Sequence, residues 1–500
     1  MDLEGLLFKN LGRMPPALVK WIEKRIHSVP SIAAKIDKEY DDMMGGLEGS
    51  VKPYRTRFPS FSEIPETGRN REDILRDMEA MRREEESHWK DGYVSGGVYN
   101  GDAGHIAFLN DVYALNSQSN PLHADVWPSS AKFEAEIVAM TASMLGGGGL
   151  DIHGTVSSGG TESILLAMKT YRDRARDLRG IRHPEIVVPV TAHAAFDKAG
   201  RYFGIKTVHV PVDGDFRADP IAAQKAVNHN TICIIGSAPS FPHGVVDPIK
   251  ELSELARRHH IGFHTDACLG GFVLPWAAKL GYPVPPFDFS LPGVTSISAD
   301  THKYGYAAKG TSVILYRGRD LLHYQYYTTT EWPGGLYFSP TFAGSRPGAL
   351  SAACWAAMTS IGAQGYLDAT RKILETASEI REGVQGIAGL RLLGDSLFVV
   401  AFASEVVDIY KVMDFMSRKK WSLNGMNKPT CLHLCVTLRH AQPGVAQRFI
   451  NDLREAVDYV RMHPSEKGTM APVYGLAATI PMRGLVSDML KKYLDLMFKV

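Results

Sequence analysis

The chain has 500 residues, 45% hydrophobic and 22% charged, and its 55 basic and 54 acidic side chains give a formal net charge of +1. A general nucleic-acid binder normally carries a basic excess, so this near balance argues against nucleic acid as a partner. Five cysteines in 500 residues do not form a disulfide framework, and they favour a reduced, cytoplasmic setting. The absence of any apolar run of about 18 residues predicts that no segment spans a membrane.

The N-terminal part of the chain is predicted to be helical. It lacks the basic start, apolar block and cleavage site of a secretory signal. Residues 15–36 can form an amphipathic helix, for which we favour packing on the protein itself and keep peripheral membrane contact as the alternative. Residues 74–92 predict a charged helix that ends at Gly92, and we interpret its charge run as a solvated face.

From about residue 125 to 320, short β-branched runs alternate with helical stretches. Seven runs are typical of buried strands, and they are residues 151–156, 185–190, 205–212, 231–238, 261–267, 294–298 and 311–317. Between the first two, residues 161–177 predict a helix with Ile164, Leu165 and Met168 on one face. This alternation predicts an α/β fold with a mostly parallel sheet that is covered on both faces.

The C-terminal part follows a different pattern. A helix at residues 371–385 leads into strands at 390–394, 397–403 and 431–438, and helices return at the end, which predicts a smaller α+β lobe. Cys431 and Cys435 share the last strand with His433. A metal site is one interpretation, but this spacing puts both sulfurs on one packed face, so we favour a core position.

Ligands of an open α/β sheet bind at the carboxyl ends of its strands, and four motifs fall at such ends. The first is SSGGTESILLAM, which places Gly159, Gly160 and Thr161 between a strand and a helix. Backbone N–H groups and the positive end of the helix would bind a phosphate there. The alternative is a tight turn capped by Thr161 or Ser158.

The second and third motifs supply an aspartate and a histidine. Asp266 ends an otherwise apolar strand, where a carboxylate needs a partner. A protonated pyridine nitrogen would satisfy it, and a helix cap or an Asp–Arg pair is the alternative. His193 follows another strand. It can cap a helix, form part of the core with its hydrogen bonds satisfied, or stack its flat ring on a cofactor.

The fourth motif is SADTHKYG, which presents Lys303 directly after a strand. An isolated lysine is usually structural or exposed, but this amine can form an imine with an aldehyde if burial and neighbours lower its pKa. His302 can hydrogen-bond a phosphate. The four motifs suit the phosphate, ring face, ring nitrogen and aldehyde of pyridoxal 5′-phosphate, which we therefore predict as the cofactor.

The order of these motifs resembles that of the fold-type I pyridoxal-phosphate enzymes, and within them the group II decarboxylase-like branch. In that branch, the chain is similar to the sphingosine-1-phosphate lyases. The resemblance runs from about residue 90 into the C-terminal lobe. It rests on SGGTES, AHAAFDKA, HTDACLGG, HKYGYAAKG, SGGVYNG, NPLHADVWPS, FAGSRPG and VYGLAAT. It implies a helical segment at 1–60, an extension at 61–124 that contributes to the active site, a large cofactor-binding domain at 125–370 and a small α+β domain at 371–500.

The resemblance also implies a homodimer with active sites at the subunit interface. In it Lys303 binds the cofactor, His193 stacks on the ring and Asp266 holds the ring nitrogen. The residues implied around the cofactor phosphate are Gly159, Gly160, Thr161, His302 and the partner subunit's Ser345. Those implied around the substrate phosphate are Tyr99, Asn120 and His123, with Lys309 and Tyr474 assisting on the substrate side.

The implied reaction is retro-aldol cleavage of the C2–C3 bond of sphingosine 1-phosphate or a related long-chain base phosphate, which gives a fatty aldehyde and phosphoethanolamine. An L-amino-acid decarboxylase would use the same Lys303, Asp266 and His193 and is the alternative, although Tyr99, His123 and Lys309 favour a phosphate. A catalytically dead scaffold is the non-enzymatic alternative, against which the intact Lys303 and Asp266 argue.

The eukaryotic members of the family carry an N-terminal membrane span that this sequence lacks. We therefore expect a soluble, bacterial-type form in the cytoplasm. Secretion into a host cell is left open by the sequence.

Overall fold

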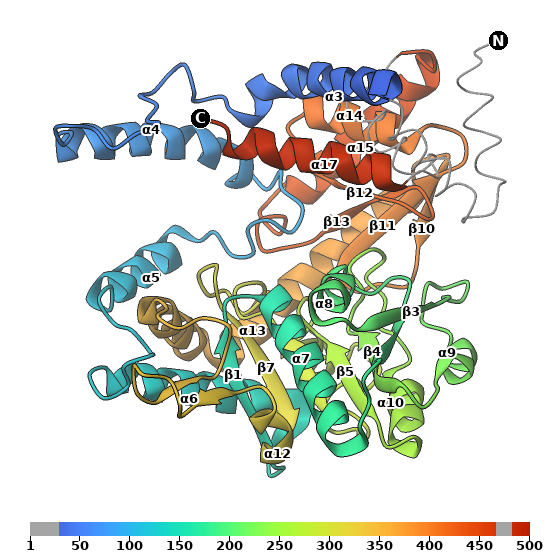
Figure 1. Ribbon diagram of the computed structural model, residues 1–500. Coiled ribbons are helices and arrows are strands. Elements are labelled where there is room, and N and C mark those ends of the chain that lie inside the picture. Colours follow the sequence, from blue (N-terminus) through green and yellow to red (C-terminus); the bar gives the residue numbers. More distant parts are fainter. Residues whose placement is uncertain (1–29, 467–482) are drawn as a thin grey trace. The chain divides into compact units, whose positions relative to one another are not determined.

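The structure is a computed structural model that describes residues 30–466 and 483–500 (Figure 1). The chain divides into two compact units. The larger comprises Val94–Ala403 and His433–Arg454, and the other comprises Met1–Tyr93, Ser404–Leu432 and Glu455–Val500. The four regions expected from the sequence stay a prediction.

The larger unit is built on a seven-stranded sheet in the order β1-β7-β6-β5-β4-β2-β3. Its strands are β1 (Ile152–Ser157), β2 (Glu185–Pro189), β3 (Lys206–Val210), β4 (Thr231–Ser237), β5 (Gly262–Asp266), β6 (Ser296–Ala299) and β7 (Ser312–Arg317). Strands β2 to β6 pair in parallel, and β7 runs antiparallel to both β1 and β6. All seven predicted strands and the mostly parallel α/β sheet are confirmed.

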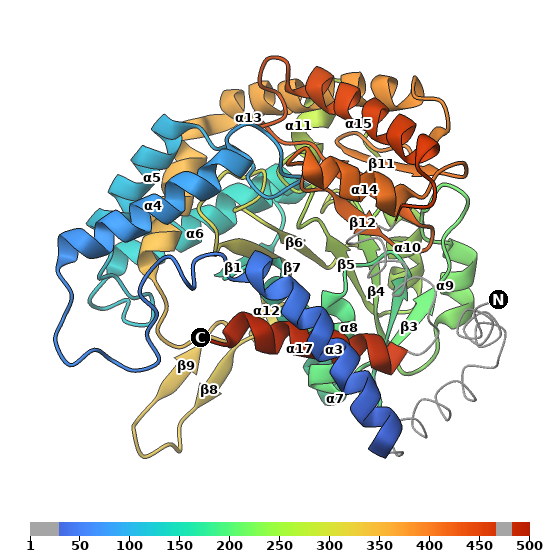
Figure 2. The same ribbon diagram turned by 90° about the horizontal axis from the view of Figure 1, so that it is seen from above.

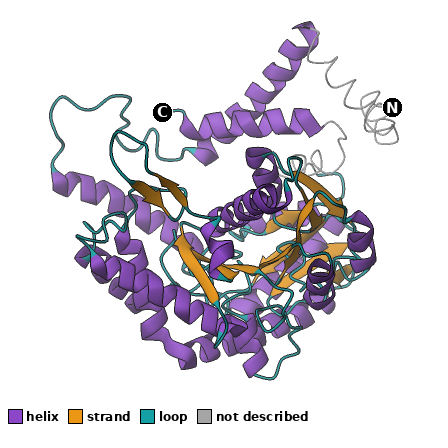
Figure 3. Ribbon diagram, turned by 60° about the horizontal axis from the view of Figure 1, so that its bottom comes forward, coloured by secondary structure: helices purple, strands orange, loops and turns teal. Residues whose placement is uncertain are grey.

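Helices cover both faces of this sheet (Figure 3). They are α5 (Ala103–Leu115), α6 (Pro128–Ala142), the π-helical turn Ser143–Gly147, α7 (Gly160–Arg179), α8 (Ala195–Phe203), α9 (Pro220–Ala226), α10 (Ile249–Arg258), α11 (Leu274–Lys279), α12 (Arg319–His323) and α13 (Gly348–Gln385). Ile164 and Tyr171 of α7 share a buried cluster with Ile235 of β4. Gly236 comes next and faces the opposite way, where a Cβ would lie 2.5 Å from Cδ1 of Ile249. Thus α7 and α10 cover opposite faces.

The carboxyl ends of β1, β5 and β6 meet at one edge of the sheet, because these three strands run in the same direction. Asp266, the last residue of β5, pairs with Ser298 of β6. Helix α7 begins at Gly160, three residues after β1 ends at Ser157. The phosphate-type turn, the strand-end aspartate and the lysine motif therefore gather at the same edge, as the sequence predicts.

A hairpin of β8 (Tyr327–Thr329) and β9 (Tyr337–Ser339) was not anticipated from the sequence. Figure 2 shows it apart from the seven-stranded sheet. Tyr327 and Phe338 are exposed. Strands of three residues with solvated side chains carry no burial pattern from which they could be recognised.

The remaining strands form a four-stranded sheet in the order β10-β11-β13-β12. They are β10 (Leu390–Leu393), β11 (Val399–Ser404), β12 (Asn424–Met426) and β13 (Cys431–Cys435). The remaining helices are α3 (Pro30–Val51), α4 (Arg71–Trp89), α14 (Ile409–Arg418), α15 (Val445–Met462) and α17 (Arg483–Phe498). The charged helix is confirmed as α4, which starts where Asn70 Oδ1 accepts a hydrogen bond from the backbone N–H of Glu72 (2.7 Å).

The described part of the chain bears on the cysteine pair, on metal clusters and on membrane-spanning helices. Cys431 and Cys435 are both buried, as expected of core residues. Over residues 30–466 and 483–500, no three His, Cys, Asp or Glu side chains gather in a way that could hold a metal ion. Within the same residues, no helix has the length and apolar character needed to cross a membrane.

We expect Gly262→Ala to destabilise the large unit. A Cβ at this position of β5 would lie 2.3 Å from Cε1 of Tyr171, whose hydroxyl is held by Thr295 (2.7 Å) and Ser296 (2.6 Å). Overpacking of this kind costs about 1–3 kcal/mol, which lowers the melting temperature of a unit of this size by about 1–4 °C. The control is Gly148→Ala, where nothing lies within 4 Å of the added Cβ. Equal melting temperatures for both variants would contradict the packing argument.

Candidate active site

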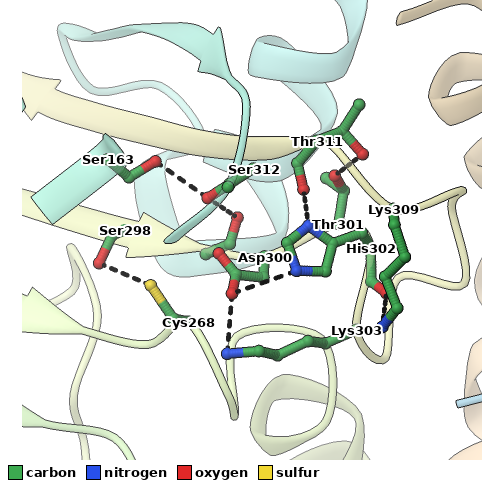
Figure 4. Close-up of polar contacts among 12 residues, drawn as sticks. Ser163, Cys268, Ser298, Asp300, Thr301, His302, Lys303, Lys309, Thr311 and Ser312 are labelled. Atoms are coloured by element: carbon green, nitrogen blue, oxygen red, sulfur yellow. Dashed lines mark hydrogen bonds and ion pairs between the residues drawn. The ribbon is translucent and has the colours of Figure 1, made fainter. Parts of the chain in front are cut away.

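Lys303 lies in the turn that follows β6 (Figure 4). Its side chain is 24% exposed, and Nζ lies 2.8 Å from Oδ2 of Asp300, whose side chain is 2% exposed. Burial alone would lower the pKa of Lys303, but the Asp300 carboxylate outweighs it, so that the pKa lies above its ordinary value. The sequence-based expectation of a lowered pKa therefore does not hold for the unlinked lysine, because that expectation did not include Asp300.

The backbone around Lys303 is anchored on both sides of the turn. The Tyr304 hydroxyl donates a hydrogen bond to the carbonyl of Val436 (2.6 Å). The Tyr366 hydroxyl, from α13, donates to the carbonyl of Gly305 (2.9 Å). Both phenols are buried, so these bonds are shielded from competition by water. They fix the direction in which the lysine leaves the strand.

The turn between β1 and α7 has the properties of a phosphate site. No side chain caps α7, and the Glu162 carboxylate instead accepts a hydrogen bond from the backbone N–H of Ser158 (2.7 Å). A Cβ on Gly160 would lie 2.7 Å from Oδ1 of Asp300 and 2.8 Å from Sγ of Cys268, so only glycine fits. The turn capped by Thr161 or Ser158 is therefore not what forms, and the first N–H groups of α7 face the site edge.

His302 lies against the same glycine turn. Its Nδ1 is 2.6 Å from the carbonyl of Thr311, so Nδ1 carries the proton in the neutral ring. Its Nε2 is 3.8 Å from Oδ2 of Asp300. Burial lowers the pKa of His302, and the Asp300 carboxylate opposes that effect. A Cβ on Gly159 would be 3.5 Å from His302 Cε1, so the structure brings His302 to the turn that holds Gly159, Gly160 and the exposed Thr161.

Asp266 is buried at the end of β5 in a polar network. Its Oδ1 accepts hydrogen bonds from the backbone N–H of Cys268 (3.1 Å) and from Oγ of Ser298 (3.4 Å). The Ser298 Oγ also contacts Nε2 of His264 (3.1 Å). No hydrogen bond from the described residues reaches Oδ2 of Asp266. One carboxylate oxygen is thus oriented by the protein and the other suits a protonated ring nitrogen.

His193 is exposed at the site edge, between β2 and α8. Its Nδ1 accepts a hydrogen bond from the backbone N–H of Ala195 (3.2 Å) at the start of α8. This is the cap that the sequence analysis considered. The bond holds the ring by one edge atom and leaves the ring face for stacking, so both interpretations agree with the geometry. Stacking on a cofactor stays a prediction.

Lys309 and Tyr99 lie together beside the lysine turn. Nζ of Lys309 is 4.5 Å from the centre of the Tyr99 ring and 3.5 Å from the carbonyl of His302. Burial, helped by the charge of Lys303, lowers the pKa of Lys309 to about 8. Burial raises the pKa of Tyr99, so its hydroxyl stays protonated and can donate. The pair offers one cation and one neutral donor, which is a set that binds phosphate.

Asn120, His123 and Ser345 form a separate group. Asn120 Nδ2 donates to Oγ of Ser345 (3.1 Å), and the carbonyl of Asn120 accepts a hydrogen bond from the backbone N–H of His123 (3.0 Å). In the described part of the chain, no hydrogen bond joins these side chains to Lys303. Their predicted phosphate roles, and the placement of Ser345 in a partner's site, stay predictions. Tyr474 lies outside the described residues.

Four site residues escaped the sequence analysis, namely Asp300, Ser298, Cys268 and His264. Asp300, Ser298 and His264 are buried and polar, within a strand or directly after one, and Cys268 is a buried thiol two residues after β5. A buried polar residue needs a partner, and that need is the signal that could have found them. Asp300 was the easiest of the four to predict. It lies three positions before Lys303, and residues this close at a strand end share one turn.

Fold and site together define a fold-type I pyridoxal-phosphate enzyme. The family model of the pyridoxal-dependent decarboxylase conserved domain matches residues 56–397. A sphingosine-1-phosphate lyase of Oryza sativa is 46% identical over 483 residues, which cover 94% of this chain and 88% of that protein. The chain therefore belongs to the sphingosine-1-phosphate lyase family, and pyridoxal 5′-phosphate is its cofactor.

Solved structures agree with this assignment. The sphingosine-1-phosphate lyase of Burkholderia pseudomallei is 42% identical with a TM-score of 0.83, over 89% of this chain and 99% of that one. A glutamate decarboxylase of Lactobacillus brevis is 20% identical with a TM-score of 0.69, over 83% of this chain and 98% of that one. The second likeness shows the fold alone.

We expect Gly160→Ala to weaken cofactor binding by about tenfold or more, which corresponds to about 1.4 kcal/mol or more. The added methyl group would displace Asp300 or Cys268 and disturb the first turn of α7. Titration of the cofactor-free protein with pyridoxal phosphate, followed by absorbance, measures the change. Gly148→Ala is the matched control, because its Cβ meets no atom within 4 Å. Unchanged affinity in Gly160→Ala would place the phosphate elsewhere.

Proposed function

We propose that this chain cleaves the C2–C3 bond of sphingosine 1-phosphate or a related long-chain base phosphate, giving a fatty aldehyde and phosphoethanolamine. The observation that carries this proposal is the 46% identity with a sphingosine-1-phosphate lyase over 94% of the chain. The geometry supports it, because Lys309 and Tyr99 provide a second place for a phosphate beside Lys303.

Each residue of the site has a task in this reaction. When bound, pyridoxal phosphate accepts the electron pair that remains on C2 after the C2–C3 bond breaks. Asp266 keeps the ring nitrogen protonated, and the start of α7 with His302 binds the cofactor phosphate. Lys309 and the Tyr99 hydroxyl bind the substrate phosphate and so orient the C2–C3 bond. Binding energy from this remote group is used to position the reacting bond.

An L-amino-acid decarboxylase is the alternative function, and it is supported only by the broad family model and the shared fold. Such an enzyme needs a cation for a carboxylate and no second phosphate site. The structures of decarboxylases are 16–20% identical to this chain, against 42% for the lyase structure. A scaffold without activity does not account for the polar network that orients Asp266.

The assembly and location are part of the same proposal. We place Asn120, His123 and Ser345 of one protomer in the site of its partner, in a homodimer. The Asn120–Ser345 hydrogen bond supports this, because it keeps the three residues as one group (3.1 Å). We place the protein in the cytoplasm, and its five free cysteines support that location.

The proposed function predicts that the purified protein converts sphingosine 1-phosphate to equal amounts of long-chain aldehyde and phosphoethanolamine, measured by mass spectrometry. Lys303→Ala should abolish both turnover and the absorbance band of the lysine-linked cofactor. Release of carbon dioxide from an amino acid, without cleavage of the lipid phosphate, would move the function to the decarboxylase. Turnover by Lys303→Ala would refute the assignment of the lysine.

The pKa of Lys309, about 8, predicts how substrate binding depends on pH. The ammonium is present below pH 8 and is lost above it, so KM should be constant below pH 8 and should rise above it, by at most about tenfold per pH unit. Lys309→Arg keeps its charge in this range and should remove the rise. Lys309→Met should have a high KM throughout. A wild-type KM that is flat from pH 7 to 9.5 would contradict a phosphate role.

A further inference from the structure

Asp300 is the buried charge of the site that the reaction just described does not use. Its side chain is 2% exposed, with Oδ2 at 2.8 Å from Lys303 Nζ and 3.8 Å from His302 Nε2. Among the described residues, no donor reaches its Oδ1. A carboxylate is costly to bury, so a residue at this place needs a partner that compensates its charge.

A purely structural role does not fit these contacts. A structural aspartate after a strand usually caps a turn when its carboxylate accepts backbone N–H bonds, as Asp213 after β3 does from Asp215 (2.9 Å) and Arg217 (2.9 Å). The carbonyl of Asp300 accepts a bond from the Lys303 N–H (3.3 Å), but no described backbone N–H donates to its carboxylate. Its contacts are with side chains, and both of the side chains it faces have assigned roles in the site. The carboxylate is therefore directed at the chemistry.

Asp300 also lies against the phosphate turn. A Cβ on Gly160 would be 2.7 Å from Oδ1 and 2.8 Å from Oδ2. The start of α7 favours negative charge, which lowers the cost of holding a carboxylate there. A cofactor phosphate at the same helix end adds further negative charge, which the Lys303 ammonium beside it offsets. Asp300 is thus the common neighbour of the amine, the imidazole and the phosphate turn.

We propose that Asp300 is a positioning residue for Lys303, which holds the lysine ammonium charged and beside the phosphate turn whenever its nitrogen is not bonded to the cofactor. The inference rests on the proposed function in one respect, that Lys303 is the residue that binds the cofactor. In this role Asp300 keeps the released lysine in reach and prevents its neutral amine from competing with the substrate amine.

The other groups that face Lys303 do not provide this effect. Lys309 is a cation and repels the ammonium, and this repulsion adds to the larger effect of desolvation in lowering the pKa of Lys309. Burial raises the pKa values of the Cys268 thiol and the Tyr99 hydroxyl, so both stay neutral at working pH. His302 is neutral or positive. Asp300 is the carboxylate that contacts Nζ within the described residues.

The test is the pH dependence of Lys303 acylation in the full-length, cofactor-free protein. Only a neutral amine reacts with acetic anhydride, and peptide mass spectrometry reports each lysine separately. Wild-type Lys303 should react with an apparent pKa above its ordinary value of 10.5. Asp300→Asn keeps the shape and removes the charge, and should increase acylation of Lys303 at pH 9 by about tenfold or more. Asp215→Asn, an exposed carboxylate with Arg217 at 3.9 Å, is the matched control and should change nothing.

Two outcomes would overturn the inference. One is a wild-type Lys303 that acylates as an ordinary lysine, and this measurement does not depend on any variant folding. The other is an Asp300→Asn protein that melts cooperatively and has the wild-type acylation profile. Borohydride reduction of the loaded wild-type protein separates this inference from the proposed function. Cofactor fixed on Lys303 with an unchanged profile refutes only the role of Asp300, whereas no cofactor on Lys303 refutes the proposed function.

Discussion

The active site depends on a buried charge that has to be compensated, the ammonium of Lys303 beside Asp300. Burial disfavours the ammonium of Lys303, which is 24% exposed, and the Asp300 carboxylate at 2.8 Å outweighs that effect. Pairing Lys303 with Asp300 constrains the surrounding backbone. The turn has to be rigid, and Tyr304 and Tyr366 anchor it. The neighbouring position on α7 has to be glycine, because a Cβ there would meet the carboxylate.

The Lys303–Asp300 ion pair is not explained by a gain in folding stability. Replacing a buried ion pair by apolar residues of similar volume is often neutral or stabilising, whereas removing one partner leaves an uncompensated charge at a cost of about 3–5 kcal/mol. The same holds for Asp266 with Ser298 and His264, which are buried polar residues of β5 and β6. The large unit obtains its stability from the apolar layers between the sheet and its helices, and Asp266 and Ser298 lie at the edge where the carboxyl ends of β5 and β6 meet.

Sequence patterns predict those features of the structure that depend on local residue order. Strands covered on both faces are nearly continuous apolar runs, so all seven strands of the large sheet were recognisable. Asp266 and Lys303 were recognisable because each interrupts such a run at its end. The contacts of Asp300, Ser298 and Cys268 were not, because they depend on the register that places Asp266 opposite Ser298 and on a helix end from another part of the chain. The same limit applies to Ser345, whose contact with Asn120 joins positions 225 residues apart.

The Lys303–Asp300 ion pair is also relevant to the question of why one fold supports both cleavage and decarboxylation. The cofactor chemistry is common to both, so the reaction is decided by the groups that orient the substrate. Lys309 is proposed as one of those groups, and it is a second cation close enough to Lys303 for the charge of Lys303 to contribute to the lowering of its pKa. Two lysines can share this space because Asp300 neutralises one of them.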